Sequence, residues 1–251
     1  MIIDIHAHVG VSWLGWGDEF SSFEEMLNLY NKYKIDKVCL SSFLIFYDPP
    51  TGNKEIYEII RKYPERFIGF VVISPRYGEK AVYQEIDKCI TTYHMKAIKI
   101  HPSANQYHAD SYVIDPVMEK AIEYDVPVHC HTWSDEYANP NRIERVARRF
   151  PQAKIIMAHI GFEDWLDAIY VAKKHENVYL DTGGSLTERA VLRQAIRECG
   201  DDRIVWGSDS PTMNLGAELA RIAEAPDVDV SSQAKEKILY KNAESLLKLN
   251  F

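Results

Sequence analysis

Eight short runs of β-branched and other apolar residues, alternating with segments of helical spacing, constrain the fold of this chain most strongly. Short apolar runs predict strands, and apolar residues at i, i+3, i+4 and i+7 predict amphipathic helices. The predicted strands are 2–9, 37–43, 67–73, 96–101, 126–132, 154–160, 178–183 and 203–209. Eight strands alternating with helices in 251 residues favour a single (β/α)8 TIM barrel.

Helix signals fill the gaps between these strands. Ser22 and Glu25 form a capping box ahead of the first helix. Two further helices follow from apolar spacing at Ile143, Val146, Ala147 and Phe150, and at Leu192, Ala195, Ile196 and Cys199. A last helix is predicted over 232–249. A doubly wound sheet is the rival fold, but HAHVGVSWLGWG lacks its glycine-rich phosphate loop. No linker divides the chain, so we expect one domain over 1–251.

The charge, hydropathy and cysteine content of the chain limit the kinds of molecule that it is expected to bind. The formal net charge of −8 argues against a broad nucleic-acid surface, and no apolar run approaches the roughly 20 residues of a membrane span. The start MIIDIHAHVG has no basic segment typical of a secretory signal, and the four cysteines show no close pairing. We therefore expect a cytoplasmic protein that binds a small molecule and not nucleic acid or membrane. A homodimer is left open.

Histidines gather in the predicted strands, and strand parity gives them a direction. Successive side chains point to opposite faces, so apolar rows pack on the helices while polar rows point into the barrel. On the fifth strand this puts His129 and His131 inward, and on the sixth it puts Met157 and His159 inward with Ile156 outward. The other inward polar residues are Asp4, His6, His8, Lys99, His101 and Asp209.

Depth along the strands indicates a metal site. His8, His131, His159 and Asp209 lie at the carboxyl ends of their strands, where barrel active sites are built. A lone strand histidine is usually a hydrogen-bonded core residue. Several imidazoles and a carboxylate at one mouth are costly to bury unpaired, and a divalent cation satisfies them together. We predict one metal ion, Zn²⁺ first, with Mn²⁺ or Fe²⁺ as alternatives.

Six segments together resemble the amidohydrolase superfamily, in particular its amidohydrolase-2 branch with the aminocarboxymuconate semialdehyde decarboxylase-like enzymes. They are DIHAHVG (4–10), IKIHPS (98–103), VPVHCHT (126–132), IIMAHIG (155–161), YLDTGG (179–184) and WGSDSP (206–211), and NAESLLKL (242–249) resembles the family's last helix. The resemblance runs over essentially the whole chain. It is far more specific for the fold and metal site than for the substrate.

The predicted ligands are His6, His8, His131 and Asp209. The resemblance favours His131 over His129, because the family's PVxxH segment ends on the ligand; His129 also lies about 7 Å deeper along its strand. The predicted catalytic residues are Asp209, which takes a proton from metal-bound water and returns it, and His159, which hydrogen-bonds the substrate oxygen or the water.

Lys99 decides between one metal and two. In two-metal relatives a strand-four lysine is carbamylated and bridges the ions, and Lys99 and His159 would then join the ligands. One-metal relatives also carry this lysine. We expect one metal and an uncarbamylated Lys99 that pairs with Asp4 or Asp181.

The substrate is the least constrained feature. Trp13, Trp133, His101 and His108 are candidate pocket residues, and Arg76 is a weak candidate for binding a carboxylate. The leading prediction is a hydrolase of a small amide, cyclic amide or lactone, and the alternative is a non-oxidative decarboxylase of a small carboxylic acid. A TatD-like nuclease is disfavoured because IKIHP and GSD replace that family's motifs. A non-catalytic metal-binding protein is the remaining class.

Overall fold

Eight parallel strands form one barrel in the computed structural model, which describes residues 1–10 and 23–249. They follow chain order: β1 (Ile3–Val9), β2 (Lys37–Ser42), β3 (Phe67–Val72), β4 (Ala97–Ile100), β5 (Val128–Cys130), β6 (Ile155–Met157), β7 (Val178–Asp181) and β8 (Ile204–Val205). Beyond β8, Asp209 N donates to His6 O and His8 N donates to Ser210 O, both at 2.7 Å. These bonds join the segment after the last strand to the first strand and close the barrel, so the predicted fold is confirmed.

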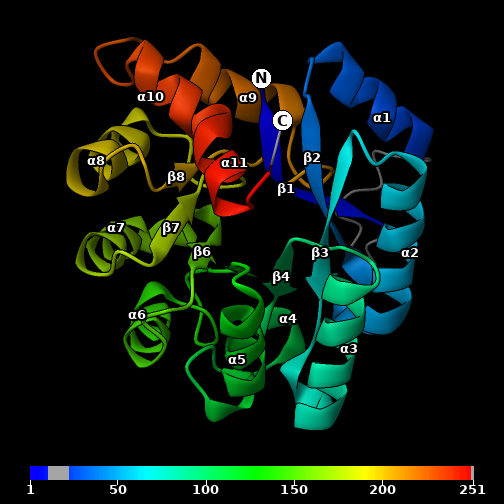
Figure 1. The fold of residues 1–251 in the computed structure, drawn as a ribbon. Helices are drawn as coiled ribbons and strands as arrows, with labels where there is room; N and C mark the ends of the chain where they lie inside the picture. The colour runs from blue at the N-terminus through cyan, green and yellow to red at the C-terminus, as the bar shows by residue number, and fades with distance from the viewer. Residues whose placement is uncertain (11–22, 250–251) are drawn as a thin grey trace.

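Helices form a ring around the strands, with α1 to α3 along one side and α6 to α8 along the opposite side (Figure 1). The helices are α1 (Phe23–Lys32), α2 (Pro49–Lys62), α3 (Glu79–Thr91), α4 (Pro102–Asn105), α5 (Asp115–Tyr124), α6 (Pro140–Arg149), α7 (Trp165–Lys174), α8 (Arg189–Cys199), α9 (Leu215–Ala223), α10 (Ser232–Glu236) and α11 (Asn242–Leu246). A π-helical turn, Lys237–Lys241, joins α10 to α11. No helix in the described ranges is long and apolar enough to cross a membrane.

The predicted helices appear with small changes at their ends. Apolar spacing correctly located α6 and α8, although α6 stops one residue before Phe150. The predicted 232–249 helix runs from Ser232 to Leu246 through the π-helical turn. The capping box at Ser22 falls outside the described residues.

Strand parity is confirmed in β4 and β5 and wrong in β6. Ile98, Ile100, Val128 and Cys130 belong to the large core cluster shared with the helices, as expected for outward residues. In β6 that cluster contains Met157, whereas Ile156 belongs to a second buried cluster with Phe70 and Ala97 inside the barrel. His159 therefore does not reach the site by alternation along a strand.

Backbone turns after short strands place the site residues. The predicted strands include His101, His131, His159 and Asp209, but none of these residues lies in an observed strand. β4 and β5 end one residue before His101 and His131, and β6 and β8 end two and four residues before His159 and Asp209. His159 and Asp209 have φ values of 60° and 53°, in the left-handed region that few non-glycine residues adopt. Local turns, and not strand period, orient these side chains.

Candidate metal centre

Two histidines of β1 and the aspartate after β8 converge at the carboxyl end of the barrel. His6 Nε2 lies 3.1 Å from His8 Nε2, and Asp209 Oδ1 lies 3.0 Å from His8 Nε2 and 3.3 Å from His6 Nε2. All three side chains are buried. Residues 201 positions apart in the chain, His8 and Asp209, thus meet because the barrel closes.

The three donor atoms fit a divalent cation. Bonds of about 2.0–2.2 Å around a metal place neighbouring ligand atoms roughly 3.0–3.5 Å apart, the spacing seen here. The other ring nitrogens are already engaged: His6 Nδ1 lies 2.6 Å from Asp181 Oδ2, and His8 Nδ1 lies 2.8 Å from Ser41 Oγ. These contacts leave the Nε2 lone pairs facing each other and the Asp209 carboxylate. Such a group of acceptors is favourable when a cation lies between them.

His131, the predicted fourth ligand, lies beside this triad and not within it. Its Nδ1 is 3.1 Å from His159 Nε2, and its ring stacks on His101 with centroids 3.7 Å apart. Among the described residues, the group with metal-ligand spacing contains His6, His8 and Asp209 without His131. The reason is local, because His131 follows the last residue of β5 and its ring packs against the loops after β4 and β6.

His129 lies deeper and contacts a residue whose role the sequence analysis missed. Its Nε2 is 3.0 Å from Asp181 Oδ2, and its Nδ1 is 3.1 Å from Lys99 Nζ. His6, His129 and Asp181 form a second group with donor atoms at metal-ligand spacing. Strand alternation on β7 predicts that Asp181 points inward, but the sequence analysis proposed it only as a partner for Lys99.

The expected pairing of Lys99 with a carboxylate is wrong. Lys99 Nζ lies 3.0 Å from His6 Nε2 and 3.1 Å from His129 Nδ1. The carboxylates have other partners, because Asp181 accepts from the two imidazoles and Asp4 accepts from Ser208. Burial lowers the pKa of Lys99 to about 8, partly offset by the charges of Asp209 and Asp181.

The electrostatics suit metal binding. Burial lowers the pKa of five imidazoles, those of His6, His8, His101, His129 and His131. Neutral imidazole is the form that donates a lone pair to a metal. Burial alone would raise the pKa of Asp209, but the neighbouring His6 and His8 hold that pKa well below its usual range. The triad therefore offers two neutral donors and one anion.

Aromatic rings line the mouth next to the triad. Phe43 stacks on His8 at 4.7 Å, and Phe46 lies 5.4 Å from the ring of His101. Trp133 stacks on Phe162 at 3.7 Å and meets the edge of His159 at 5.4 Å. We call His8, Phe43, Phe46, His101, His131, Trp133 and Phe162 the aromatic wall.

The structure divides the predicted pocket residues. His101 and Trp133 belong to the aromatic wall, whereas His108 is exposed and packs near Tyr137. Trp13 falls outside the described residues. The sequence analysis missed Phe43 and Phe46, although the segment FLIF (43–46), which begins at the last residue of the second predicted strand, was a usable signal. Arg76 donates to the backbone oxygens of Asn105 and Gln106, which is a structural role.

Comparison with known proteins identifies the class. The sequence model described as Amidohydrolase matches residues 49–249. The chain therefore belongs to the amidohydrolase family, in the amidohydrolase-2 branch. No curated protein matches it.

Solved structures share the whole barrel. Superposition on 5-carboxyvanillate decarboxylase from Sphingomonas paucimobilis gives a TM-score of 0.79 at 17% identity, covering 99% of both chains. A 2,6-dihydroxybenzoate decarboxylase from Rhizobium gives 0.81 at 18% identity, covering 99% of this chain and 98% of that one. A dihydroxybenzoic acid decarboxylase from a Polaromonas species, with bound manganese and 2-nitroresorcinol, gives 0.81 at 19% identity, covering 100% and 97%. At these identities the likeness establishes the fold.

Proposed function

We propose that this protein is a metal-dependent decarboxylase of a small aromatic acid. The observation that carries the proposal is the triad of His6, His8 and Asp209 next to the aromatic wall. Three structural neighbours are decarboxylases of hydroxylated aromatic acids, which supports the alternative predicted from the sequence over the leading hydrolase prediction. The hydrolase prediction has its support at the level of the family.

The chain's own residues divide the work of holding metal and substrate. His6, His8 and Asp209 would hold one divalent ion, and His131 would join them only if its ring turned away from His159. When bound, the ion would supply an electrophile that orients and polarises substrate oxygens. The neighbour with manganese favours Mn²⁺ beside Zn²⁺ as the metal to test.

Lys99 and the aromatic wall provide complementary contacts for an aromatic anion. Lys99 is the one lysine or arginine in the fully buried set of the described residues, and its Nζ lies 3.0 Å from His6 Nε2. A buried cation there can pair with a carboxylate or phenolate oxygen. The aromatic wall surrounds this cation with flat rings that stack on one another, as Phe43 does on His8 and Trp133 on Phe162, and such surroundings favour a planar substrate. His159 would reach the reacting atoms through Nε2 only if its 3.1 Å contact with His131 Nδ1 opened, because its Nδ1 is held by Gly183 O.

Hydrolysis is the second candidate, and the state of Asp209 favours it. His6 and His8 keep this carboxylate ionised, so that it can accept a proton from water but has none to donate at neutral pH. A small amide or lactone would then be the substrate class.

A substrate panel tests the proposal. Protein loaded separately with Mn²⁺ and Zn²⁺ is assayed for carbon dioxide release from hydroxybenzoates and for hydrolysis of small amides and lactones. We expect metal-dependent carbon dioxide release that is lost on chelation and restored by the ion. Hydrolysis without decarboxylation would support the second candidate, and activity that survives complete metal removal would contradict both.

A further inference from the structure

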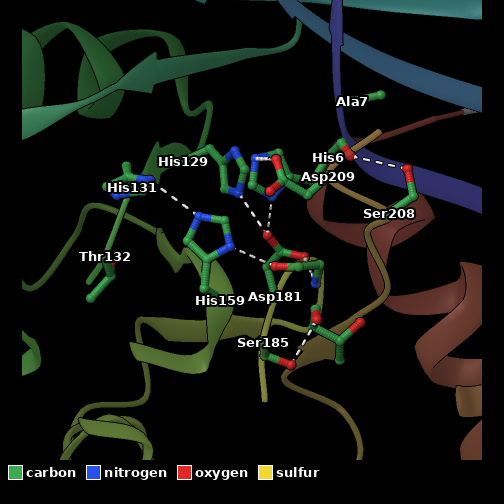
Figure 2. A network of polar contacts seen from close by, with 12 residues as sticks. His6, Ala7, His129, His131, Thr132, His159, Asp181, Ser185, Ser208 and Asp209 are labelled. Carbon is green, nitrogen blue, oxygen red and sulfur yellow. Dashed lines mark hydrogen bonds and ion pairs between the residues drawn. The ribbon is translucent and has the colours of Figure 1, made fainter. Parts of the chain in front are cut away.

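One buried carboxylate that is not among the predicted ligands contacts two imidazoles of the centre and the turn beside them. Asp181 is the last residue of β7 and is fully buried. Its Oδ2 lies 2.6 Å from His6 Nδ1 and 3.0 Å from His129 Nε2, and its Oδ1 accepts from Gly183 N at 2.9 Å. Figure 2 shows the imidazoles of His129 and His159 facing Asp181 from two sides.

The first two contacts fix which ring nitrogen carries the proton. A carboxylate oxygen accepts, so His6 must donate from Nδ1 and His129 must donate from Nε2. His6 Nε2 is then a lone pair that faces His8, Asp209 and, at 3.0 Å, Lys99 Nζ. His129 Nδ1 is also a lone pair, and it accepts from Lys99 Nζ at 3.1 Å.

The third contact reaches His159 and His131 through the backbone. With its N–H held by Asp181, Gly183 presents its carbonyl oxygen to His159 Nδ1 at 2.6 Å. His159 must donate from Nδ1, which leaves its Nε2 to accept from His131 Nδ1 at 3.1 Å. His131 Nε2 is then its free lone pair.

We propose that Asp181 is the positioning residue of the metal centre. It sets the tautomers of His6 and His129 directly, and it holds the Gly183 turn whose carbonyl sets those of His159 and His131. The inference rests on the proposed metal site, because it concerns the lone pairs which that site offers. Only glycine fits at position 207 beside Asp181, because a Cβ there would lie 2.5 Å from Asp181 Oδ1 and 2.5 Å from His6 Cβ.

Asp181→Asn tests the proposal with almost no change in shape. Three N–H groups point at two carboxylate oxygens, whereas an amide has one oxygen and one NH₂. In one amide orientation the NH₂ faces the N–H groups of both imidazoles, and in the other it faces the N–H of Gly183. Either the two imidazoles or the Gly183 turn that contacts His159 must therefore rearrange. We expect the dissociation constant for Zn²⁺ or Mn²⁺, measured by chelator competition, to rise about 10–100-fold.

Asp4→Asn is the matched control. Asp4 is an equally buried carboxylate that accepts from Ser208 N, Ser208 Oγ and His6 N, without touching an imidazole ring in the described contacts. An amide can satisfy these partners, because its oxygen accepts the two backbone N–H groups. We expect its metal dissociation constant to stay within about threefold of wild type.

Imidazole nitrogen NMR of the wild-type protein tests the same inference without any variant. In both zinc-loaded and chelator-treated protein, His159 is expected with its proton on Nδ1 and His129 with its proton on Nε2. The opposite tautomer at His129, or unchanged metal affinity and tautomers in folded Asp181→Asn, would overturn the inference. Wild-type protein that binds no divalent metal would instead overturn the proposed function, while the tautomer spectra would still test the role of Asp181.

Discussion

At the scale of single residues, two buried aspartates beside His6 respond to burial in opposite ways. Burial raises the pKa of Asp4 to about 7, because its hydrogen bonds from Ser208 and His6 N only partly offset the loss of water. Asp209 is also buried, but His6 and His8 hold its pKa low. Near neutral pH the Asp4 carboxyl is therefore only partly ionised, which suits a structural role, whereas Asp209 is an anion, which suits a metal ligand.

Asp209→Asn should abolish turnover while part of the metal is retained. The amide oxygen can still coordinate weakly, but the anionic charge and the proton acceptor are both lost. We expect activity to fall by at least about 10³-fold, with a metal content between zero and the wild-type value. Activity assays and elemental analysis of the same sample measure both, and comparable turnover in the two proteins would refute the role of Asp209.

Asp4→Asn should change the pH dependence of stability. The folded protein keeps the Asp4 proton up to about pH 7, whereas the unfolded chain loses it above about pH 3.8, so wild-type stability falls as pH rises through this window. Asparagine does not titrate. Between pH 5 and pH 8 the difference in unfolding free energy should shift by about 3 kcal/mol in favour of the variant. Urea unfolding at both pH values measures it, and a constant difference would contradict the assignment.

At the scale of elements, the turn after β7 packs directly against the centre. Gly184 has a φ of +65°, and a Cβ there would lie 2.8 Å from His159 Nδ1 and 2.9 Å from Asp209 Oδ2. The turn therefore needs glycine both for its backbone conformation and for its closeness to two site residues.

Gly184→Ala should weaken metal binding and activity. Gly200→Ala is the control that separates backbone strain from the steric contact with His159 and Asp209. Gly200, at the end of α8, has a φ of +78° with nothing within 4 Å of its added Cβ. Both variants should lose about 1–2 kcal/mol of stability to backbone strain. Only Gly184→Ala should weaken metal binding, by more than about tenfold. Equal metal affinities in the two variants would show that the turn does not touch the centre.

At the scale of the whole molecule, the proposed ion connects the first strand to the segment after the last. Closure by backbone bonds alone already joins His6 to Asp209 and His8 to Ser210. An ion between His6, His8 and Asp209 would add a bond across the same seam, so metal binding and global stability should be coupled.

Metal removal should lower the melting temperature. An ion at about 100 times its dissociation constant stabilises a folded protein by about 2.7 kcal/mol, or roughly 5–10 °C for a chain of this size. His6→Ala and His8→Ala should lose most of this response because each removes a ligand. Calorimetry with and without chelator gives the shift, and an equal shift in the variants would place the ion elsewhere.

The metal count should be one per chain. A second cation in the group of His6, His129 and Asp181 would be repelled by the ammonium of Lys99, whose Nζ lies 3.1 Å from His129 Nδ1. Elemental analysis of protein grown with excess metal and bicarbonate should give a ratio near one. A ratio near two that falls to one or below in Lys99→Ala would support the two-metal alternative.

Periodicity was enough to predict the barrel and the convergence of three site residues. The spacing of apolar residues is a local property of the sequence, so it predicts each strand and helix. Eight strands alternating with helices then specify the barrel. His6 and His8 lie inside β1, and alternation predicts their inward direction although the pairing of β1 with β2 shifts register between Asp4 and Ala7. Parallel strands bring Asp209 to the same end, where a local turn orients it. These predictions required no knowledge of contacts between residues far apart in the sequence.

Contacts between distant loops determined the remainder of the centre. His131 and His159 follow the ends of β5 and β6, where left-handed or irregular backbone replaces the period of two, so their directions cannot be counted along the chain. The partners of Lys99 and Asp181 come from strands far apart in sequence, and hydrogen-bond geometry chooses among several nearby groups. The sequence determines which face of a strand each side chain points to. Which neighbours that side chain contacts depends on how the closed barrel packs.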